Sequence, residues 1–202
     1  MKYPDFMDYY LAIAIGLENH EVVDVYGFGG EFLNEDRPLK IKTSRKEDVI
    51  NDISEDGIHV EIFGLDVNFN RISETVKFEE SRVVHTKSNF YRVNSACVTN
   101  GINIGDISID KFLVIPSMIG NAMNSNYTLP NNMEGYITTL YNPNDEDMSL
   151  IIRNGQSIKK VLSFRGFYEF KVPYKVKPAT DIVLRSDNLL DGSMQIILLE
   201  NS

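Results

Sequence analysis

Two acidic residues in the segment Gly64–Phe78, GLDVNFNRISETVKF, have the types and spacing that could support chemistry. Glycosidases cleave sugars with a pair of carboxyl groups, and Asp66 and Glu74 could supply such a pair. Asp66, however, falls in a polar, turn-like stretch, and spacing fixes no other carboxylate as a partner for Glu74. The chemistry therefore depends on what kind of element carries Glu74.

The residues around Glu74 alternate as in a β-strand. This alternation places Glu74 on the same face as Ile72 and Val76. A carboxylate between apolar neighbours is costly to bury without a partner. We therefore predict that Glu74 lies at a rim or an interface, or pairs with Arg71 or Arg92, and that it belongs to a sheet and not to a reactive site.

Other catalytic patterns are missing from the sequence. The histidines are His20, His59 and His85, with no H-E-x-x-H pair, and no serine lies in G-x-S-x-G. The glycine-rich stretch Tyr26–Phe32 lacks the spacing of a phosphate-binding loop, and the acidic loop Asn142–Ser149 lacks the order of an EF-hand. We predict no catalytic, metal-binding or cofactor-binding residues, no cofactor, and a protein that is not an enzyme.

The length, composition and net charge of the chain limit the kinds of partner that we expect. The chain has 202 residues, 43% of them hydrophobic, and a net charge of −9, so we expect no nucleic-acid partner. The single cysteine, Cys97, has no partner for an internal disulfide and is expected in the core. The first apolar stretch, Leu11–Leu17, follows acidic residues and is shorter than the about 20 residues that span a bilayer. We expect no signal peptide, no membrane contact and a soluble intracellular product.

The first 20 residues contain the predicted helix. Asp5 follows Pro4 and suits a helix start, and Gly16 suits its end. Apolar residues recur at steps of three and four, and they are Leu17 and the candidate docking residues Phe6, Tyr9, Tyr10 and Ile13. We expect this helix to cover a sheet or to dock on a neighbouring protein.

After Glu21 the pattern changes to short alternating runs separated by glycine, asparagine and proline. The runs in the first half are Val22–Gly27, Leu39–Ser44, Ile58–Asp66, Arg71–Phe78, Phe90–Val98 and Gly105–Ile115, and similar runs continue to the end. The spacing predicts a mainly β protein of about a dozen strands, with a β-sandwich or jelly-roll-like architecture.

The polar stretch Ile115–Asn126 interrupts this alternation. We interpret it as a hinge, which gives three parts: a docking helix at 1–20, a first β lobe at 21–116 and a second β lobe at 117–202. A second polar region, Arg45–Gly57, fits a long turn or a brief helix.

Several short motifs follow one another in a fixed order along the chain. They are DYYLAIAIG, VVDVYGFG, VEIFGLDVNFNRISETVKF, FYRVNSACV, GDISI, YTLPNNMEGYI and TDIVLRS. Their order, from about Asp8 to Leu199, resembles a group of virion structural proteins of tailed bacteriophages, especially marine ones. The chain departs from that group because it has no tryptophan and carries Arg45–Gly57 where relatives have a segment rich in serine and glycine.

The resemblance implies a non-enzymatic virion structural protein, present in many copies as capsid decoration or cement or at the head-tail junction. It implies other phage virion proteins as partners, namely the major capsid protein or neck and tail proteins. It also implies a place in the virion after assembly in the host cytoplasm, and a homo-oligomer, with a trimer favoured.

Two rival functions stay open. The first is a tail fibre or spike module that recognises a host glycan, with Phe28, Phe32, Phe167 and Tyr168 as candidate exposed aromatic residues. Because these residues lie in or beside predicted strands, we expect them in the core. The second rival is a glycan hydrolase that uses the two carboxylates introduced above.

Overall fold

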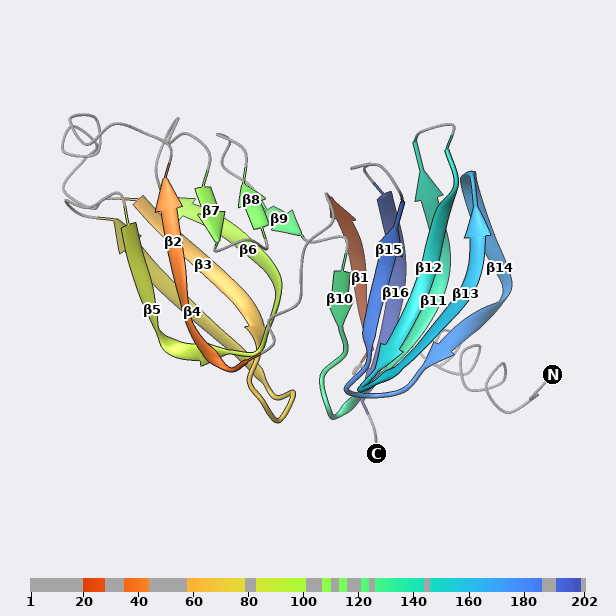
Figure 1. Cartoon of the computed structure of the whole chain (residues 1–202), viewed down its shortest axis with the longest axis horizontal. Helices are drawn as coiled ribbons and strands as arrows, with labels where there is room; N and C mark the ends of the chain where they lie inside the picture. Colours follow the sequence, from red (N-terminus) through yellow and green to blue (C-terminus); the bar gives the residue numbers. More distant parts are fainter. Residues whose placement is uncertain are drawn as a thin grey trace. The chain divides into compact units, whose positions relative to one another are not determined.

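The computed structural model describes residues 20–27, 35–43, 58–78, 83–100, 107–109, 113–115, 121–123, 126–143, 146–186 and 192–200. Their regular structure consists of sixteen β-strands, and this confirms a mainly β protein (Figure 1). The predicted helix, with Phe6, Tyr9, Tyr10 and Ile13, lies outside the described residues, as does Arg45–Gly57. Among the described residues no helix is long and apolar enough to cross a membrane.

The chain forms two compact units. The terminal unit combines Met1–Phe28 with Ser125–Ser202, and the inserted unit is Gly29–Asn124. Strand pairing explains this division. β1 (His20–Gly27) pairs along its length with β16 (Gly192–Glu200), so the first strand joins a sheet with the last strand.

These units differ from the expected lobes at 21–116 and 117–202. β1 belongs with the C-terminal part of the chain because of its pairing with β16. The stretch interpreted as a hinge contains β9 (Asn121–Met123), which pairs with β6 (Arg92–Asn100) of the inserted unit. The alternation of a strand shows which face is buried but not which distant strand is its partner, so the sequence could not predict either pairing.

The terminal unit contains two four-stranded antiparallel sheets. The β11 sheet has the order β1-β16-β11-β14, with β11 at Met133–Asn142 and β14 at Gly166–Val176. The β12 sheet has the order β10-β15-β12-β13, with β10 at Asn126–Thr128, β15 at Asp181–Arg185, β12 at Met148–Asn154 and β13 at Ser157–Phe164.

Two glycines mark where the β11 sheet and the β12 sheet approach each other. A Cβ on Gly192 would lie 2.5 Å from Sδ of Met148, and a Cβ on Gly135 would lie 2.9 Å from a methyl group of Leu129. The fully buried side chains of the two sheets include Ile137, Leu140, Ile196 and Leu198 from one sheet and Leu150 and Ile182 from the other. These residues define the inner face of each sheet.

A bulge at Thr138 changes which residues of β11 face inwards. Ile137 pairs with Ile196 and Thr139 pairs with Gln195, so Thr138 is an extra residue on β11. The Thr138 hydroxyl donates a hydrogen bond to Oε1 of Gln195 at 3.0 Å. Even-numbered residues of β11 therefore point outwards before the bulge, and odd-numbered residues point outwards after it.

The edge strand β14 is irregular in a way that protects it from pairing. Residues 170–173 lie opposite Thr138 alone, and Pro173 in this stretch has no N–H to offer. Lys171 is exposed in the same stretch. Bulges, prolines and lysines are features by which edge strands avoid pairing with other chains. Contacts of this sheet with other molecules are therefore expected at its outer face and not at this edge.

The inserted unit also contains two four-stranded antiparallel sheets. One has the order β5-β2-β7-β8, with β5 at Val83–Phe90, β2 at Arg37–Thr43, β7 at Ile107–Ile109 and β8 at Leu113–Ile115. The other has the order β4-β3-β6-β9, with β4 at Arg71–Phe78 and β3 at Ile58–Leu65. Both sheets contribute to one hydrophobic core, which includes Leu39, Ile41, Val60, Ile62, Phe78, Phe90, Val98 and Ile109.

β4 has the predicted bounds, and its burial alternates as predicted. Ile72, Glu74 and Val76 share the more buried face, while Ser73 and Thr75 are exposed. β5, in contrast, was not among the predicted strands, because its alternation is broken in the middle by Thr86–Ser88, where the strand bulges.

The expected core position of Cys97 is wrong. Ala96 and Val98 fill the core, so the alternation of β6 directs Cys97 to the opposite face, where it is half-buried and pairs across strands with Glu61. Burial and the nearby charge of Glu61 raise the pKa of this thiol.

Candidate functional site

Glu74 accepts two hydrogen bonds from the backbone of the other sheet in the inserted unit. Its Oε1 accepts from the amide N–H of Lys87 and its Oε2 accepts from that of Ser88, each at 2.7 Å. Because β4 and β5 are edge strands of different sheets, the carboxylate joins the two edges. Backbone amides, and not the predicted guanidinium groups of Arg71 or Arg92, are the partners of this carboxylate.

The two amides point towards Glu74 because β5 bulges away from β2. The register of the pair shifts there, and Leu39 of β2 alone faces residues 86–88. The Leu39 N–H donates to the hydroxyl of Thr86 at 2.8 Å, and this hydroxyl donates to the carbonyl oxygen of Ser88 at 2.9 Å. The side chain of Thr86 thus replaces part of the sheet ladder, and Glu74 satisfies the N–H groups that the bulge releases.

These contacts change the pKa of Glu74. Burial raises the pKa. The opposing effects are together larger, and they are the hydrogen bonds from the amides of Lys87 and Ser88, a bond from the Ser88 side chain and the charge of Lys87. The net shift of the pKa is therefore downward. Glu74 is therefore held in its ionised form.

Asp66 organises the turn between β3 and β4, as predicted. Its Oδ1 accepts from the amides of Asn68 at 2.8 Å and Asn70 at 2.9 Å, and its Oδ2 accepts from the side-chain amide of Asn70 at 2.9 Å. Phe69 closes the turn with a φ of 61° and packs its ring edge-on against Tyr91. Burial raises the pKa of Asp66, and the bonds from Asn70 and Asn68 lower it to a net value below its ordinary range.

Neither carboxylate has the environment of a glycosidase acid. A general acid at neutral pH needs a raised pKa, whereas the pKa values of Asp66 and Glu74 are both lowered. Each of the two also holds backbone amides that proton transfer would release. This geometry fits residues that shape a turn and join two sheets.

Two aromatic side chains are exposed at the end of the β11 sheet. Tyr141 of β11 lies directly opposite Phe167 of β14, and both point away from the β12 sheet. Tyr141 is 47% exposed and Phe167 is 64% exposed. We call these two residues the aromatic pair. The exposure of Tyr141 was not predicted, because it depends on the bulge at Thr138, which shifts the alternation of β11 and arises from strand pairing.

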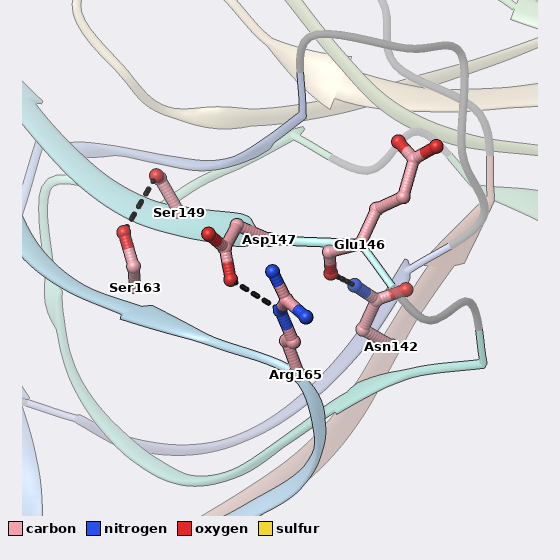
Figure 2. A network of polar contacts seen from close by, with 6 residues as sticks. All are labelled: Asn142, Glu146, Asp147, Ser149, Ser163 and Arg165. Atoms are coloured by element: carbon pink, nitrogen blue, oxygen red, sulfur yellow. Dashed lines mark hydrogen bonds and ion pairs between the residues drawn. The ribbon is translucent and has the colours of Figure 1, made fainter.

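A polar network lies beside the aromatic pair, where β11, β12, β13 and β14 meet their connections (Figure 2). The Arg165 Nε donates to Oδ1 of Asp147 at 2.6 Å, and the Asn142 side chain donates to the carbonyl oxygen of Glu146 at 2.7 Å. The hydrogen bond and charge of Arg165 lower the pKa of Asp147. Since Asn142 follows Tyr141 and Arg165 precedes Phe167 by two residues, these contacts hold both ends of the aromatic pair in place.

A second group of aromatic residues lies on the inner side of β14. Tyr168 packs edge-on against Phe170 at 5.0 Å between ring centroids, and Phe170 lies 6.0 Å from Tyr174. Lys159 of β13 donates to the Tyr174 hydroxyl at 3.2 Å. This row follows the edges of both sheets. Tyr168 is nevertheless 39% exposed.

The expected core positions of Phe167 and Tyr168 are therefore wrong. Both residues lie in a strand, but the run expected from Lys159 to Val176 is divided into β13 and β14 at Arg165, and β14 lies at a sheet edge, which is a tertiary property. The other two aromatic candidates, Phe28 and Phe32, lie outside the described residues.

The described residues include no group of three or more histidine, cysteine, aspartate or glutamate side chains that could hold a metal ion. Of the acidic residues in the loop Asn142–Ser149, Glu146 and Asp147 are described, and Asp147 binds Arg165.

Comparison with protein-family models, with curated proteins and with solved structures found no match for the chain. The resemblance to phage virion proteins stays a prediction from the sequence motifs.

Proposed function

We propose that the protein is a non-enzymatic structural component of a bacteriophage virion that assembles in multiple copies. It decorates or cements the capsid, or forms part of the head-tail junction, and contacts the major capsid protein or neck and tail proteins. The β-sandwich or jelly-roll-like form of the two units, the N-terminal helix and a homo-oligomeric, trimeric state are part of this proposal.

The aromatic pair is the observation that carries the proposal. Tyr141 and Phe167 are exposed directly opposite each other on neighbouring strands, so the outer face of the β11 sheet offers two adjacent aromatic side chains for contact with another molecule. Aromatic residues are also enriched where proteins bind each other. The carboxylates that could have done chemistry are instead bound to backbone amides, as expected of a rigid framework.

Incorporation into particles tests this function. A phage that carries Tyr141→Ser with Phe167→Ser should lose at least about tenfold in copies per virion, measured by quantitative mass spectrometry, if the pair is an interface centre. Ile158→Ser is the matched control, because Ile158 is 68% exposed on the opposite sheet of the same unit, and it should leave incorporation unchanged. Absence of the wild-type protein from purified virions would overturn the proposal.

Host recognition is the second candidate, and the exposure of Phe167 on the outer face of the β11 sheet favours it. Aromatic side chains also stack on sugars, so a fibre or spike module would use the same surface for a glycan. Binding of the purified protein to host cells, lost on Phe167→Ser, together with no binding to empty capsids, would support this candidate over the first.

A further inference from the structure

A base, an aromatic ring and a carboxylate lie together on the outer face of the β11 sheet. Lys175 of β14 pairs across strands with Tyr136 of β11, and Glu134 precedes Tyr136 by two positions on the same face. Nζ of Lys175 is 5.5 Å from the centroid of the Tyr136 ring and 2.9 Å from Oε2 of Glu134. Burial lowers the pKa of Lys175, but its hydrogen bonds to Glu134 and Tyr136 and the attraction of both groups raise the pKa to a net value above its ordinary range. A ring and a carboxylate thus hold this cation.

Two other tyrosine rings also lie beside a base of the chain. The guanidinium carbon of Arg92 is 4.0 Å from the centroid of the Tyr91 ring, and Nζ of Lys159 is 5.6 Å from that of the Tyr174 ring. Tyr141 differs from these tyrosines, because no base and no other ring among the described residues contacts its ring. The ring of Tyr141 is therefore open to another molecule.

The aromatic pair repeats the arrangement without the base. Tyr141 of β11 lies opposite Phe167 of β14, and Glu169 follows Phe167 by two positions on the same face. The cross-strand partner of Glu169 is Thr139, which in turn precedes Tyr141 by two positions. Residues two positions apart on a strand, and diagonal neighbours across strands, are about 7 Å apart, so Glu169 stands next to both rings. Rings and a carboxylate are in place, but the cation that Lys175 supplies at the other end of this face is missing.

Glu169 has no counter-charge in the described part of the chain. Its side chain is exposed and makes no ion pair or hydrogen bond with a described residue, including the exposed Lys171 two positions further on. It is also the one acidic residue between Met148 and Lys177, a stretch with seven lysines and arginines. The surplus of bases in this stretch therefore leaves the carboxylate beside the aromatic pair unpaired.

We propose that the aromatic pair and Glu169 bind an arginine side chain of a partner virion protein. The guanidinium group stacks on the rings and donates hydrogen bonds to the carboxylate. Arginine fits this site better than lysine, because its planar group stacks on aromatic faces and offers two parallel N–H donors to a carboxylate. This inference rests on the proposed function and adds the chemistry of the partner, whose contact surface presents an arginine.

Binding of the purified full-length protein to particles assembled without it tests the role of Glu169. Glu169→Gln keeps the size of the side chain and removes its charge, and it should weaken binding in co-sedimentation about tenfold, which corresponds to about 1.4 kcal/mol. Higher salt should weaken binding of the wild type more than binding of this variant. Glu200→Gln is the matched control, because Glu200 is an exposed carboxylate at the opposite end of the same sheet, and it should leave binding unchanged.

Three outcomes of this experiment would overturn the proposal. They are wild-type binding by Glu169→Gln, an equal loss in Glu200→Gln, and a loss in Phe167→Ser that Glu169→Gln does not share. The last outcome would indicate an apolar or sugar contact at the aromatic pair in place of an arginine.

A peptide probe tests the same site without a particle. The tripeptide glycyl-arginyl-glycine should shift the NMR signals of the Tyr141 ring in tyrosine-labelled protein, with Tyr141→Phe used for assignment. Glu169→Gln should lose this response, and glycyl-citrullyl-glycine, whose neutral urea group has the shape of guanidinium, should give none. Equal shifts with both peptides, or no shift with either, would overturn the arginine site even where the protein binds particles. A shift specific to arginine, combined with no wild-type binding to particles, would support the arginine site and overturn the proposed function.

Discussion

Glu74 shows how a strand can carry a charged residue on its more buried face. The side chain meets two N–H groups of a bulge in the neighbouring sheet, so the charge is satisfied by hydrogen bonds and the bulge gains the acceptor that it lacks. The sequence correctly predicted the face of Glu74 and the need for a partner. It could not predict the partner, because a bulge arises from strand pairing and has no pattern of its own.

Removing this carboxylate should destabilise the inserted unit. We expect Glu74→Gln to lower its free energy of unfolding by about 1–2 kcal/mol at pH 7, since a side-chain amide offers one acceptor to two N–H groups and carries no charge. Urea denaturation measures the loss. Glu61→Gln on the adjacent strand β3 is the control. A similar loss in this variant would show that removing any carboxylate charge from this sheet lowers the stability, independently of the two hydrogen bonds of Glu74.

The pH dependence of that loss follows from the lowered pKa of Glu74. A carboxylate whose pKa is lower in the folded state contributes its stability above the unfolded value, about 4.3, and loses the contribution as the pH falls through the folded value. The difference between wild type and Glu74→Gln should therefore be full at pH 7 and shrink below about pH 4. A difference that stays constant between pH 7 and pH 3 would contradict the role of the charge.

Ala179 occupies the left-handed region of backbone conformation, with a φ of 52°. An alanine is strained there by about 1 kcal/mol, and glycine is not. We expect Ala179→Gly to raise the free energy of unfolding of the terminal unit by about 0.5–1 kcal/mol. Ala96→Gly, at a fully buried strand position, should lower stability instead. Destabilisation by Ala179→Gly would show that contacts of its methyl group outweigh the strain.

At the scale of elements, the backbone of β3 lies very close to that of β6 at Gly64. A Cβ at this position would clash with the backbone oxygen of Arg92 and lie 2.8 Å from the Phe90 ring, at the point where the register of β3 and β6 shifts. We expect Gly64→Ala to cost about 3 kcal/mol, because backbone and a core ring must move.

Gly155→Ala serves as a comparison, because it tests the cost of a positive φ without the crowding found at Gly64. Gly155 has a φ of 57° in the two-residue loop between β12 and β13, but its missing Cβ would meet nothing within 4 Å. The cost there should be only about 1 kcal/mol, from conformation alone. Urea denaturation of both variants gives the comparison, and equal losses would contradict the crowding at Gly64.

A regular strand could be predicted from the sequence with its bounds and buried face, whereas the bulges could not be predicted. β4 was found with its bounds and buried face, since nothing interrupts its alternation. β5 was missed and Tyr141 was not recognised as outward-facing because the bulges at Thr86–Ser88 and Thr138 each shift the alternation. The exposed surface that carries the proposed function depends on one of these bulges, so sequence alone could not locate it.

At the scale of the whole molecule, the chain builds one unit around the insertion of another. β1 pairs with β16 although the entire inserted unit lies between β1 and β10 in the sequence. Each unit has two sheets and its own buried side chains, and no strand pair joins the two units among the described residues. The sequence indicated two β units but not this nesting, because only the pairing of β1 with the last strand creates it.

Separate cores predict separate loss of stability. Ile62 of β3 and Ile196 of β16 are both fully buried, one in each unit, so substitution by alanine leaves a similar cavity and should cost about 2–5 kcal/mol in each case. Hydrogen exchange measured by mass spectrometry reports the opening of each strand. Ile62→Ala should speed exchange in β3 and β6 and leave β11 and β16 unchanged, and Ile196→Ala should do the reverse. If either variant speeds exchange equally in both units, they unfold as one cooperative body, and the nesting of β1 with β16 then couples the units instead of only connecting them.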